Sequence, residues 1–384
     1  MVVSSCLYIS IQMYQSIFML YLKEKGASFV EIGLVASIYS WSTILTRFVS
    51  GPLSSRLGPK PFMLLSLTGL PVALILYAFA PSVVWIYPLQ ILTAVSVASF
   101  NPLAMSLVLH LAPRERKGDI VGRFLTSIGA STLLGPMISS LLLDFLDVSY
   151  QNIFLLAIAP VLTGLLVFTW TTKKGGSASE LFKDAQSEAQ TPNGVTGFAE
   201  NFRAIFASRA VILLNLSRLV FAFTLAFFRT LSPLYLVNEL GAAPGAVPLL
   251  FTFYGFLNTL TRIPAGKLIN RIRKKKLFLS GILLLVSTCF LGLSLTREYW
   301  LLALFAALFG GCHGARAVVE WILLGENVAP RLRGLANAYF ENTFDMGSAL
   351  GELSAGVLAS FLPLQTVFQV ASVTILLDAL TLVV

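Results

Sequence analysis

Twelve mainly apolar stretches, each about 20 residues or longer, occupy most of this 384-residue chain. A stretch of that length crosses the hydrocarbon core of a bilayer as a helix. Because lipid offers the backbone no hydrogen-bonding partner, a spanning segment of this kind must be helical. Only 12% of the residues are charged, about half the share in a soluble domain. The stretches are 2–22, 29–50, 61–80, 83–110, 120–143, 150–171, 209–236, 245–266, 277–296, 299–325, 334–361 and 363–383. The sequence therefore predicts an all-α polytopic membrane protein.

A segment near residue 50 recurs 215 positions later. Leu45–Arg56 and Leu260–Arg271 carry the same Leu-Thr-Arg start, and a glycine, a leucine and a final arginine also match. Ala112–Arg116 and Ala329–Arg333 match at an offset of 217. Two matches at nearly equal offsets indicate a duplicated chain. We predict an N-terminal bundle of six helices, a polar Gly- and Ser-rich linker and a C-terminal bundle of six helices: 1–171, 172–208 and 209–384.

The basic residues lie mostly on one side of the predicted helices. Nineteen of the 27 Lys and Arg residues lie in alternate loops or at the adjoining helix ends. Only Lys23, Lys25 and Arg297 lie in the loops of the other side. The positive-inside rule then places both termini in the cytoplasm of a protein of the cell membrane. We interpret the net charge of +9 as this orientation signal and expect no nucleic-acid partner.

The loop after the second predicted helix, Gly51–Lys60, reads GPLSSRLGPK and is echoed at Gly266–Lys275. It resembles the G-x-L-x-D-R-x-G-R-R/K loop of the major facilitator superfamily, and the resemblance extends over essentially the whole chain. Ser55 and Asn270 stand where the family has aspartate, so the electrostatic gate lock attributed to that aspartate is not expected here. The resemblance implies two six-helix bundles and transport by alternating access.

Four arginines occupy matching positions of the two halves and are candidate gate residues: Arg47, Arg56, Arg262 and Arg271. Arg47 and Arg262 lie at the predicted cytoplasmic ends of their helices, where the alternative is that they snorkel to the membrane surface. Arg56 and Arg271 are placed to contact phosphate, backbone or a helix end.

The fifth predicted helix contains Gly129, Gly135 and Pro136, followed by Ser139 and Ser140. This segment is similar to the glycine-proline motif of antiporters in the same family. Small residues allow close helix approach and Gly-Pro permits a kink, which would favour rocking between bundles. Simple helix packing explains the same residues. The arginine that the family carries in its fourth helix is absent from Tyr87–Gln90.

Ionisable residues inside the predicted helices are concentrated in the second half: Arg218, Arg229, Arg262, Arg316, Glu320, Glu341, Asp345, Glu352 and Asp378. A charge at mid-bilayer costs about 3 kcal/mol on insertion scales, so each should face a partner or a cavity. On each of the seventh, tenth and eleventh helices the polar residues share one face, as expected of helices lining a bundle interior. Either they form static salt bridges, or some exchange protons during transport. Our candidates for proton coupling are Glu320, Glu341 and Asp345.

The first half offers uncharged polar groups instead. Gln12 and Gln15 share a helix face, and Asn101 lies on the fourth predicted helix. Together with Arg218 and Arg316 they are the candidate substrate-binding residues. The alternative is that the amides merely satisfy one another.

These observations predict a secondary active transporter, coupled to protons or another ion, that carries a small anionic or polyhydroxylated solute. Two alternatives are a drug/proton antiporter exporting amphipathic compounds and a non-transporting receptor or lipid-handling protein on the same fold. No nucleotide-binding loop, metal-spaced Cys/His cluster or nucleophile-base pair is present in the sequence. We therefore expect no enzyme activity, no cofactor and no metal, and a monomer in contact with membrane lipid.

Overall fold

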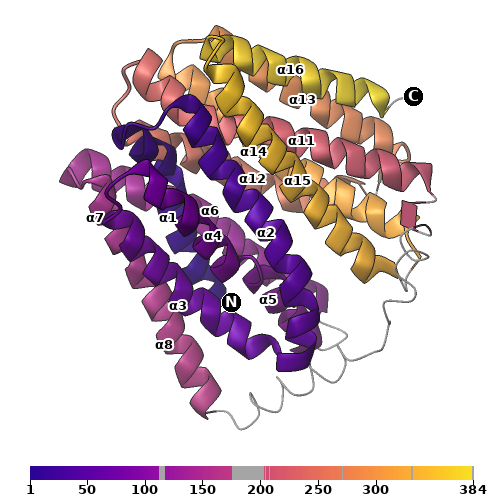
Figure 1. The fold of residues 1–384 in the computed structure, drawn as a ribbon. Coiled ribbons are helices and arrows are strands. Elements are labelled where there is room, and N and C mark those ends of the chain that lie inside the picture. The colour runs from indigo at the N-terminus through magenta and orange to yellow at the C-terminus, as the bar shows by residue number, and fades with distance from the viewer. Residues whose placement is uncertain are drawn as a thin grey trace. The chain divides into compact units, whose positions relative to one another are not determined.

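The computed structural model describes residues 1–111, 117–174, 203, 205–206, 208–269, 271–329 and 332–382 (Figure 1). This part of the chain consists of helices joined by short turns, which confirms the predicted all-α fold. The chain divides into two compact units, each described here by itself. Unit 1 is Met1–Ala27 with Ile38–Pro192, and unit 2 is Ser28–Ser37 with Asn193–Val384.

Unit 1 is built from α1 (Val2–Glu24), most of α2 (Phe29–Leu57), α3 (Pro59–Ala78), α4 (Val83–Val97), α5 (Phe100–Leu111), α6 (Lys117–Leu146), α7 (Tyr150–Leu156) and α8 (Ile158–Lys174). Unit 2 contains α11 (Arg209–Leu234), which continues into the π-helical η3 (Tyr235–Glu239), and then α12 (Ala246–Ile269), α13 (Lys275–Leu295), α14 (Tyr299–Asn327), α15 (Arg333–Ala359) and α16 (Leu364–Thr381). The bounds follow the predicted stretches closely. The exceptions are 83–110 and 150–171, each of which is two helices in line, and 29–50, where α2 continues to Leu57.

The interruption between α4 and α5 has a local cause. Pro102 has no backbone N–H, so it cannot bond to the carbonyl of Ala98 as a helical residue would. The Nε of Arg47, from α2, donates to that carbonyl at 3.4 Å. The break thus provides an acceptor for an arginine that the sequence places inside a membrane helix.

Ten of the described spans are long and apolar enough to cross a bilayer. The helices α12 and α15, with 24 and 27 residues, are also long enough, but they carry more polar side chains. Among these are Asn258 and Arg262 in α12 and Glu341 and Asp345 in α15. A spanning helix tolerates such groups where they face protein rather than lipid.

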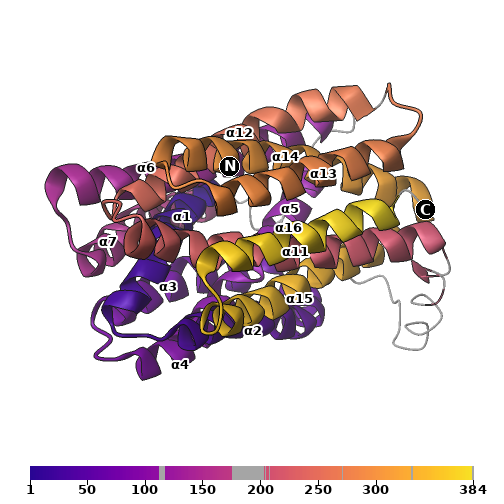
Figure 2. The ribbon, with the colours of Figure 1, turned by 90° about the horizontal axis from the view of Figure 1, so that it is seen from above.

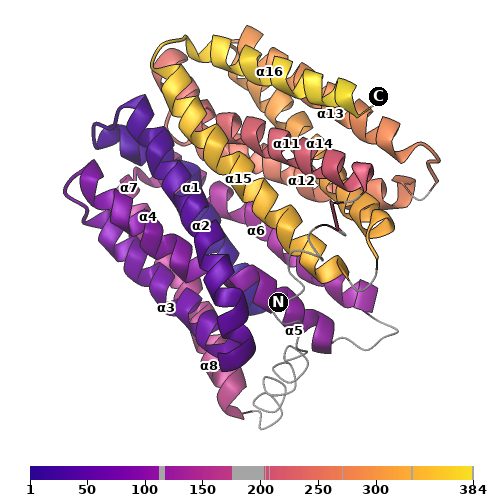
Figure 3. The same cartoon turned by 45° about the vertical axis from the view of Figure 1, so that its right-hand side comes forward.

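Two of the helix pairings are alike in both units, which agrees with the predicted duplication. The first and fifth helices of each half pack together, as α1 with α6 and as α11 with α15. The third and sixth do the same, as α3 with α7 and α8 and as α13 with α16. Figures 1 and 3 show α13 beside α16, and Figure 2 shows α16 also lying along α11.

Glycines allow the closest of these contacts. In unit 1, a Cβ on Gly135 of α6 would lie 2.6 Å from the Cβ of Gln12 in α1. One turn later Ser139 donates to the carbonyl of Met13 at 2.9 Å. The glycine-proline segment of α6 therefore packs directly on α1, beside Gln12.

Unit 2 uses two glycine pairs, each spaced four residues apart. A Cβ on Gly310 or Gly314 of α14 would lie 2.1 Å from a backbone oxygen of α12. A Cβ on Gly347 or Gly351 of α15 would lie 2.3 Å from a backbone oxygen of α11. This spacing places both glycines of a pair on one helix face, where a partner backbone can approach.

Gly310→Ala is expected to lower the melting temperature of the detergent-solubilised protein. Alanine favours a helix over glycine by about 1 kcal/mol, but overpacking a close contact costs about 1–3 kcal/mol. The matched control is Gly281→Ala in α13, because nothing lies within 4 Å of its added Cβ. That variant should melt at or above the wild-type temperature. Equal shifts in the two variants would contradict the close packing of α12 on α14.

Candidate functional site

Arg218 of α11 lies at the centre of a group of charges in unit 2. Its Nη1 lies 3.2 Å from a carboxylate oxygen of Glu320 in α14, and its Nη2 lies 2.9 Å from one of Glu341 in α15. Its Nε donates to the carbonyl of Phe340 at 2.8 Å. The guanidinium therefore bonds to two other helices with all three of its nitrogens.

Glu320 is shared between two arginines. Besides Arg218 it forms an ion pair with Arg316, one turn earlier on the same helix. The Nη2 of Arg316 also donates to the carbonyl of Ser217 at 3.3 Å. The hydroxyl of Ser217 in turn donates to Asp378 of α16 at 2.7 Å. Arg218, Arg316, Glu320, Glu341 and Asp378 are called the charge network below.

Aromatic rings surround the two arginines. The guanidinium carbon of Arg218 lies 4.1 Å from the ring centre of Phe340 and 5.2 Å from that of Trp321. That of Arg316 lies 3.7 Å from the ring centre of Phe221. Cation–π contacts of this kind offset part of the cost of taking a guanidinium out of water.

Exposure differs sharply between the two acids bound to Arg218. The side chain of Glu320 is 0% exposed, whereas that of Glu341 is 44% exposed. Asp345 lies one turn beyond Glu341 on α15 and is half-buried. The charge network thus has a sealed acid and an accessible acid, both joined to one arginine.

The three candidate substrate residues of unit 1 differ in exposure and in the groups that they contact. Gln12 is half-buried on α1 beside Gly135. Gln15 is exposed and its side chain hydrogen-bonds with that of Tyr14. Asn101 is exposed in the first turn of α5. Their role in binding a substrate stays a prediction.

The four candidate gate arginines have different surroundings. Arg56 and Arg271 are exposed at helix ends, and Arg47 reaches the carbonyl of Ala98. Arg262 is half-buried and donates to the side-chain oxygen of Asn258 at 2.9 Å. Asn270, the second position where the family carries aspartate, lies outside the described residues.

A hydrogen bond joins Tyr254 of α12 to Nδ1 of His313 of α14. From the sequence alone we assigned no role to Tyr254, His313 or Ser217. The four-residue spacing of Gly310 and Gly314 is a sequence signal for the close approach of α12 and α14 that brings the two side chains together.

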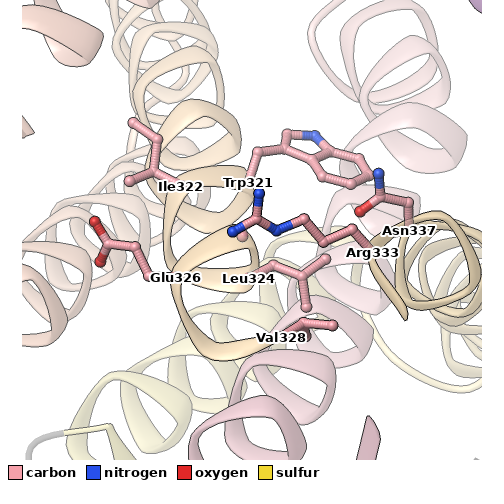
Figure 4. A pocket seen from close by; sticks show the side chains of 8 residues that line it. Trp321, Ile322, Leu324, Glu326, Val328, Arg333 and Asn337 are labelled. Atoms are coloured by element: carbon pink, nitrogen blue, oxygen red, sulfur yellow. The ribbon is translucent and has the colours of Figure 1, made fainter. Parts of the chain in front are cut away.

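A hollow of about 330 Å³ lies between the end of α14 and the start of α15 (Figure 4). Arg333 and Asn337 of α15 face Trp321 of α14 across it. Because the ring of Trp321 also lies beside Arg218, the hollow adjoins the charge network.

The chain is a helical membrane protein with two similar halves, and one half contains paired charges in its interior. These features are typical of a solute transporter. The Major Facilitator Superfamily matches residues 1–230 and 214–384, which together cover the chain. The chain therefore belongs to this superfamily and is a secondary transporter.

Two similar proteins are named for drug resistance. The multidrug resistance protein MdtG of Yersinia enterocolitica is 24% identical over 371 residues, covering 94% of this chain and 86% of that protein. The multi-drug resistance efflux pump PmrA of Streptococcus pneumoniae is 24% identical over 353 residues, covering 91% and 84%.

The fold is also that of a solved transporter. The crystal structure of the nucleoside transporter NupG matches with a TM-score of 0.78 at 12% identity, covering 99% of this chain and 96% of that one. At this identity the match concerns the fold alone, and it confirms the predicted two-bundle architecture.

Glu320→Gln is expected to destabilise the purified protein by about 3–5 kcal/mol, because it leaves two buried arginines without their shared carboxylate. Glu326→Gln, on the same helix, is the matched control. Glu326 pairs with Lys275 at the surface with its side chain 48% exposed, where an ion pair contributes about 0–1 kcal/mol. Chemical unfolding of both variants in one detergent measures the difference. Similar losses in both would show that Glu320 is not the shared partner.

Proposed function

We propose that this transporter is a proton-coupled antiporter that exports amphipathic small molecules across the cell membrane. The observation that carries the proposal is the position of Arg218 between a sealed acid, Glu320, and an accessible acid, Glu341. Arg218 can therefore be paired with both acids when Glu341 is ionised, and with Glu320 alone when Glu341 carries a proton.

The coupling step takes place at Glu341. When its carboxylate accepts a proton from water, it loses its charge and its ion pair with Arg218. Arg218 then keeps Glu320 and the carbonyl of Phe340 as partners. Because α11 and α15 are joined through the Arg218–Glu341 pair, protonation weakens one contact between them while the glycine contacts remain. Asp345, one turn further on α15, is the second candidate proton acceptor.

Alternating access requires the bundles 1–171 and 209–384 to move relative to one another, with 172–208 as the cytoplasmic linker. In this proposal Gln12, Gln15 and Asn101 contact the substrate from one bundle and Arg218 and Arg316 from the other. Arg47, Arg56, Arg262 and Arg271 act at the gates.

Export of amphipathic compounds is supported by two observations. The similar proteins MdtG and PmrA carry names that refer to multidrug resistance and efflux. The Gly135–Pro136 segment of α6, which resembles the antiporter motif, lies in close contact with α1. Neither observation depends on the charge network, so the direction of transport and the coupling can be tested apart.

Proteoliposomes loaded with rhodamine 6G or with fluorescein, a cation and an anion with the same ring system, test the coupling. An acidic exterior should speed the efflux of at least one dye in the wild type. Glu341→Gln should lose about tenfold or more of this acceleration, because its side chain cannot take up a proton. Glu326→Gln is the control and should behave as the wild type.

Two results would count against the proposal. Acceleration that is unaltered in Glu341→Gln would mean that the ion pairs are static. Binding of a dye without exchange across the membrane would favour a receptor.

We also propose that both termini are cytoplasmic, which is supported by the 19 of 27 basic residues on one side. Green fluorescent protein fused after Val384 should therefore fluoresce in bacterial cells, since it folds in the cytoplasm and not after Sec-dependent export. If this fusion were well expressed but not fluorescent, and a periplasmic reporter fused at the same site were active, the C-terminus would lie on the opposite side and the proposal would be wrong.

A further inference from the structure

Two arginines in the spanning helices of unit 2 have no acidic partner among the described residues. Arg229 lies on α11, on about the same face as Arg218 and three turns further along. Arg262 lies on α12. In the described part of the chain, the ion pairs within unit 2 include those of Arg218 and Arg316 and the surface pair of Lys275 with Glu326, and no carboxylate pairs with Arg229 or Arg262. Arg262 is half-buried and Arg229 is exposed, and both lie in membrane-spanning helices, where a positive charge is costly unless something compensates it.

A hydrogen bond holds the side chain of Arg262 in place, while its Nε donates to no acceptor. Its Nη2 donates to the side-chain oxygen of Asn258 at 2.9 Å, and the amide nitrogen of Asn258 donates to the carbonyl of Gly310 at 3.2 Å. The glycine contact between α12 and α14 sets this geometry. The Nε of Arg262 is buried and has no hydrogen-bond partner. A buried donor without a partner is uncommon, because no hydrogen bond in the protein offsets the free energy of removing it from water.

Tyr254 brings the two arginines to one place. Its side chain hydrogen-bonds with Arg229 and lies within electrostatic reach of both Arg229 and Arg262. Its hydroxyl also bonds to Nδ1 of His313. His313 in turn lies within electrostatic reach of Arg229 and Arg262. Four side chains that can donate hydrogen bonds thus meet between α11, α12 and α14.

Aromatic rings adjoin this group. The ring of Tyr254 stacks on Phe228 with the centres 5.4 Å apart, and the ring of His313 lies 5.0 Å from that of Phe221. A ligand bound at the arginines would therefore have flat apolar surface beside it. This combination suits a molecule with a negative group and an aromatic or aliphatic body.

We propose that Arg229, Tyr254, Arg262 and His313 bind the anionic group, a carboxylate or sulfonate, of an amphipathic substrate. Guanidinium groups bind such oxyanions through paired, charge-assisted hydrogen bonds. The bound anion would supply the missing partner of Arg262 Nε and neutralise charge that the protein leaves uncompensated. The inference rests on the export function proposed above and narrows its substrates to anionic amphiphiles.

Calorimetric titration of the purified full chain in zwitterionic lipid nanodiscs tests the site. The probes are naphthalene-1-sulfonate and 1-naphthylmethylammonium, which share a ring system and differ in charge. The wild type should bind the sulfonate at least tenfold more tightly than the ammonium compound. Arg262→Gln and Arg229→Gln should each weaken sulfonate binding about tenfold or more, as expected for loss of a charge-assisted bond.

Three controls separate binding from folding. Arg262→Lys keeps the charge and should recover part of the affinity, and Arg297→Gln removes an exposed arginine and should change nothing. The melting temperature of each variant without ligand shows whether it is folded. A purely structural role of Arg262 would shift that temperature and leave the preference for the sulfonate intact, which would overturn the proposal.

A lipid phosphate has the same chemistry and is distinguished by a second set of nanodiscs containing phosphatidylglycerol. If the anionic lipid abolishes sulfonate binding, the site belongs to a lipid headgroup and the substrate assignment is wrong. Equal affinity for the two naphthalene probes would overturn it as well. Failure of proton coupling is seen separately, since Glu341→Gln should bind the sulfonate as the wild type does.

Discussion

The carboxylate of Glu320, sealed inside unit 2 between Arg218 and Arg316, is the contact on which the remaining arrangement depends. Taking three charged groups out of water costs several kcal/mol for each ion. The cost is offset only because each group finds close partners: two arginines for one acid, a second acid at the surface, a backbone carbonyl and aromatic faces. These partners come from three helices, so the charges fix how α11, α14 and α15 meet.

Glycines make that meeting possible. Gly347 and Gly351 allow α15 to reach the backbone of α11, and Gly310 and Gly314 allow α14 to reach α12. At a wider spacing, Glu341 would not lie within 3 Å of Arg218. Small residues and buried charges therefore act together: the first bring the backbones close and the second specify which side chains face one another.

Four arginines in the spanning helices of unit 2 fall into two kinds. Arg218 and Arg316 are bonded to acids, whereas Arg229 and Arg262 are bonded to none of the acids that the structure describes. We infer that the first pair takes part in proton exchange as well as in the substrate contact proposed above, and that the second pair binds the negative group of the substrate. A substrate anion arriving at the second pair and a proton arriving at Glu341 act on the same helix, α11. A movement of α11 during transport would therefore involve both places.

Most of the fold follows from the sequence. Length and apolarity located each spanning segment, and two short matches disclosed the duplication, because both depend on properties that are local in the chain. Helical spacing also selected Arg218, Arg316, Glu320 and Glu341 as residues of inward faces. The pairing among them did not follow, since it depends on the rotation and depth of each helix. The link from Ser217 to Asp378 joins residues 161 positions apart, and no local pattern indicates it.

The breaks in two predicted helices were missed for a related reason. Pro102 was visible in the sequence, but a proline inside a membrane helix is tolerated when a neighbour satisfies the freed carbonyl. That neighbour, Arg47, lies 51 residues from its acceptor. That no carboxylate pairs with Arg229 or Arg262 in the described part of the chain is likewise a property of the folded protein, because α14 and α15 of the same unit carry several acids.

The most direct measurement of the central claim is the movement of protons that accompanies the substrate. Proteoliposomes are loaded with fluorescein sulfonate and with the pH indicator pyranine, and the pH is equal on both sides at the start. The fluorescence ratio of pyranine, corrected for the emission of fluorescein sulfonate, reports the lumenal pH. Outward flux of the anion should acidify the lumen in the wild type and leave it unchanged in Glu341→Gln. Efflux without any change of lumenal pH, or an equal change in both proteins, would contradict a proton-exchanging role for the charges around Arg218.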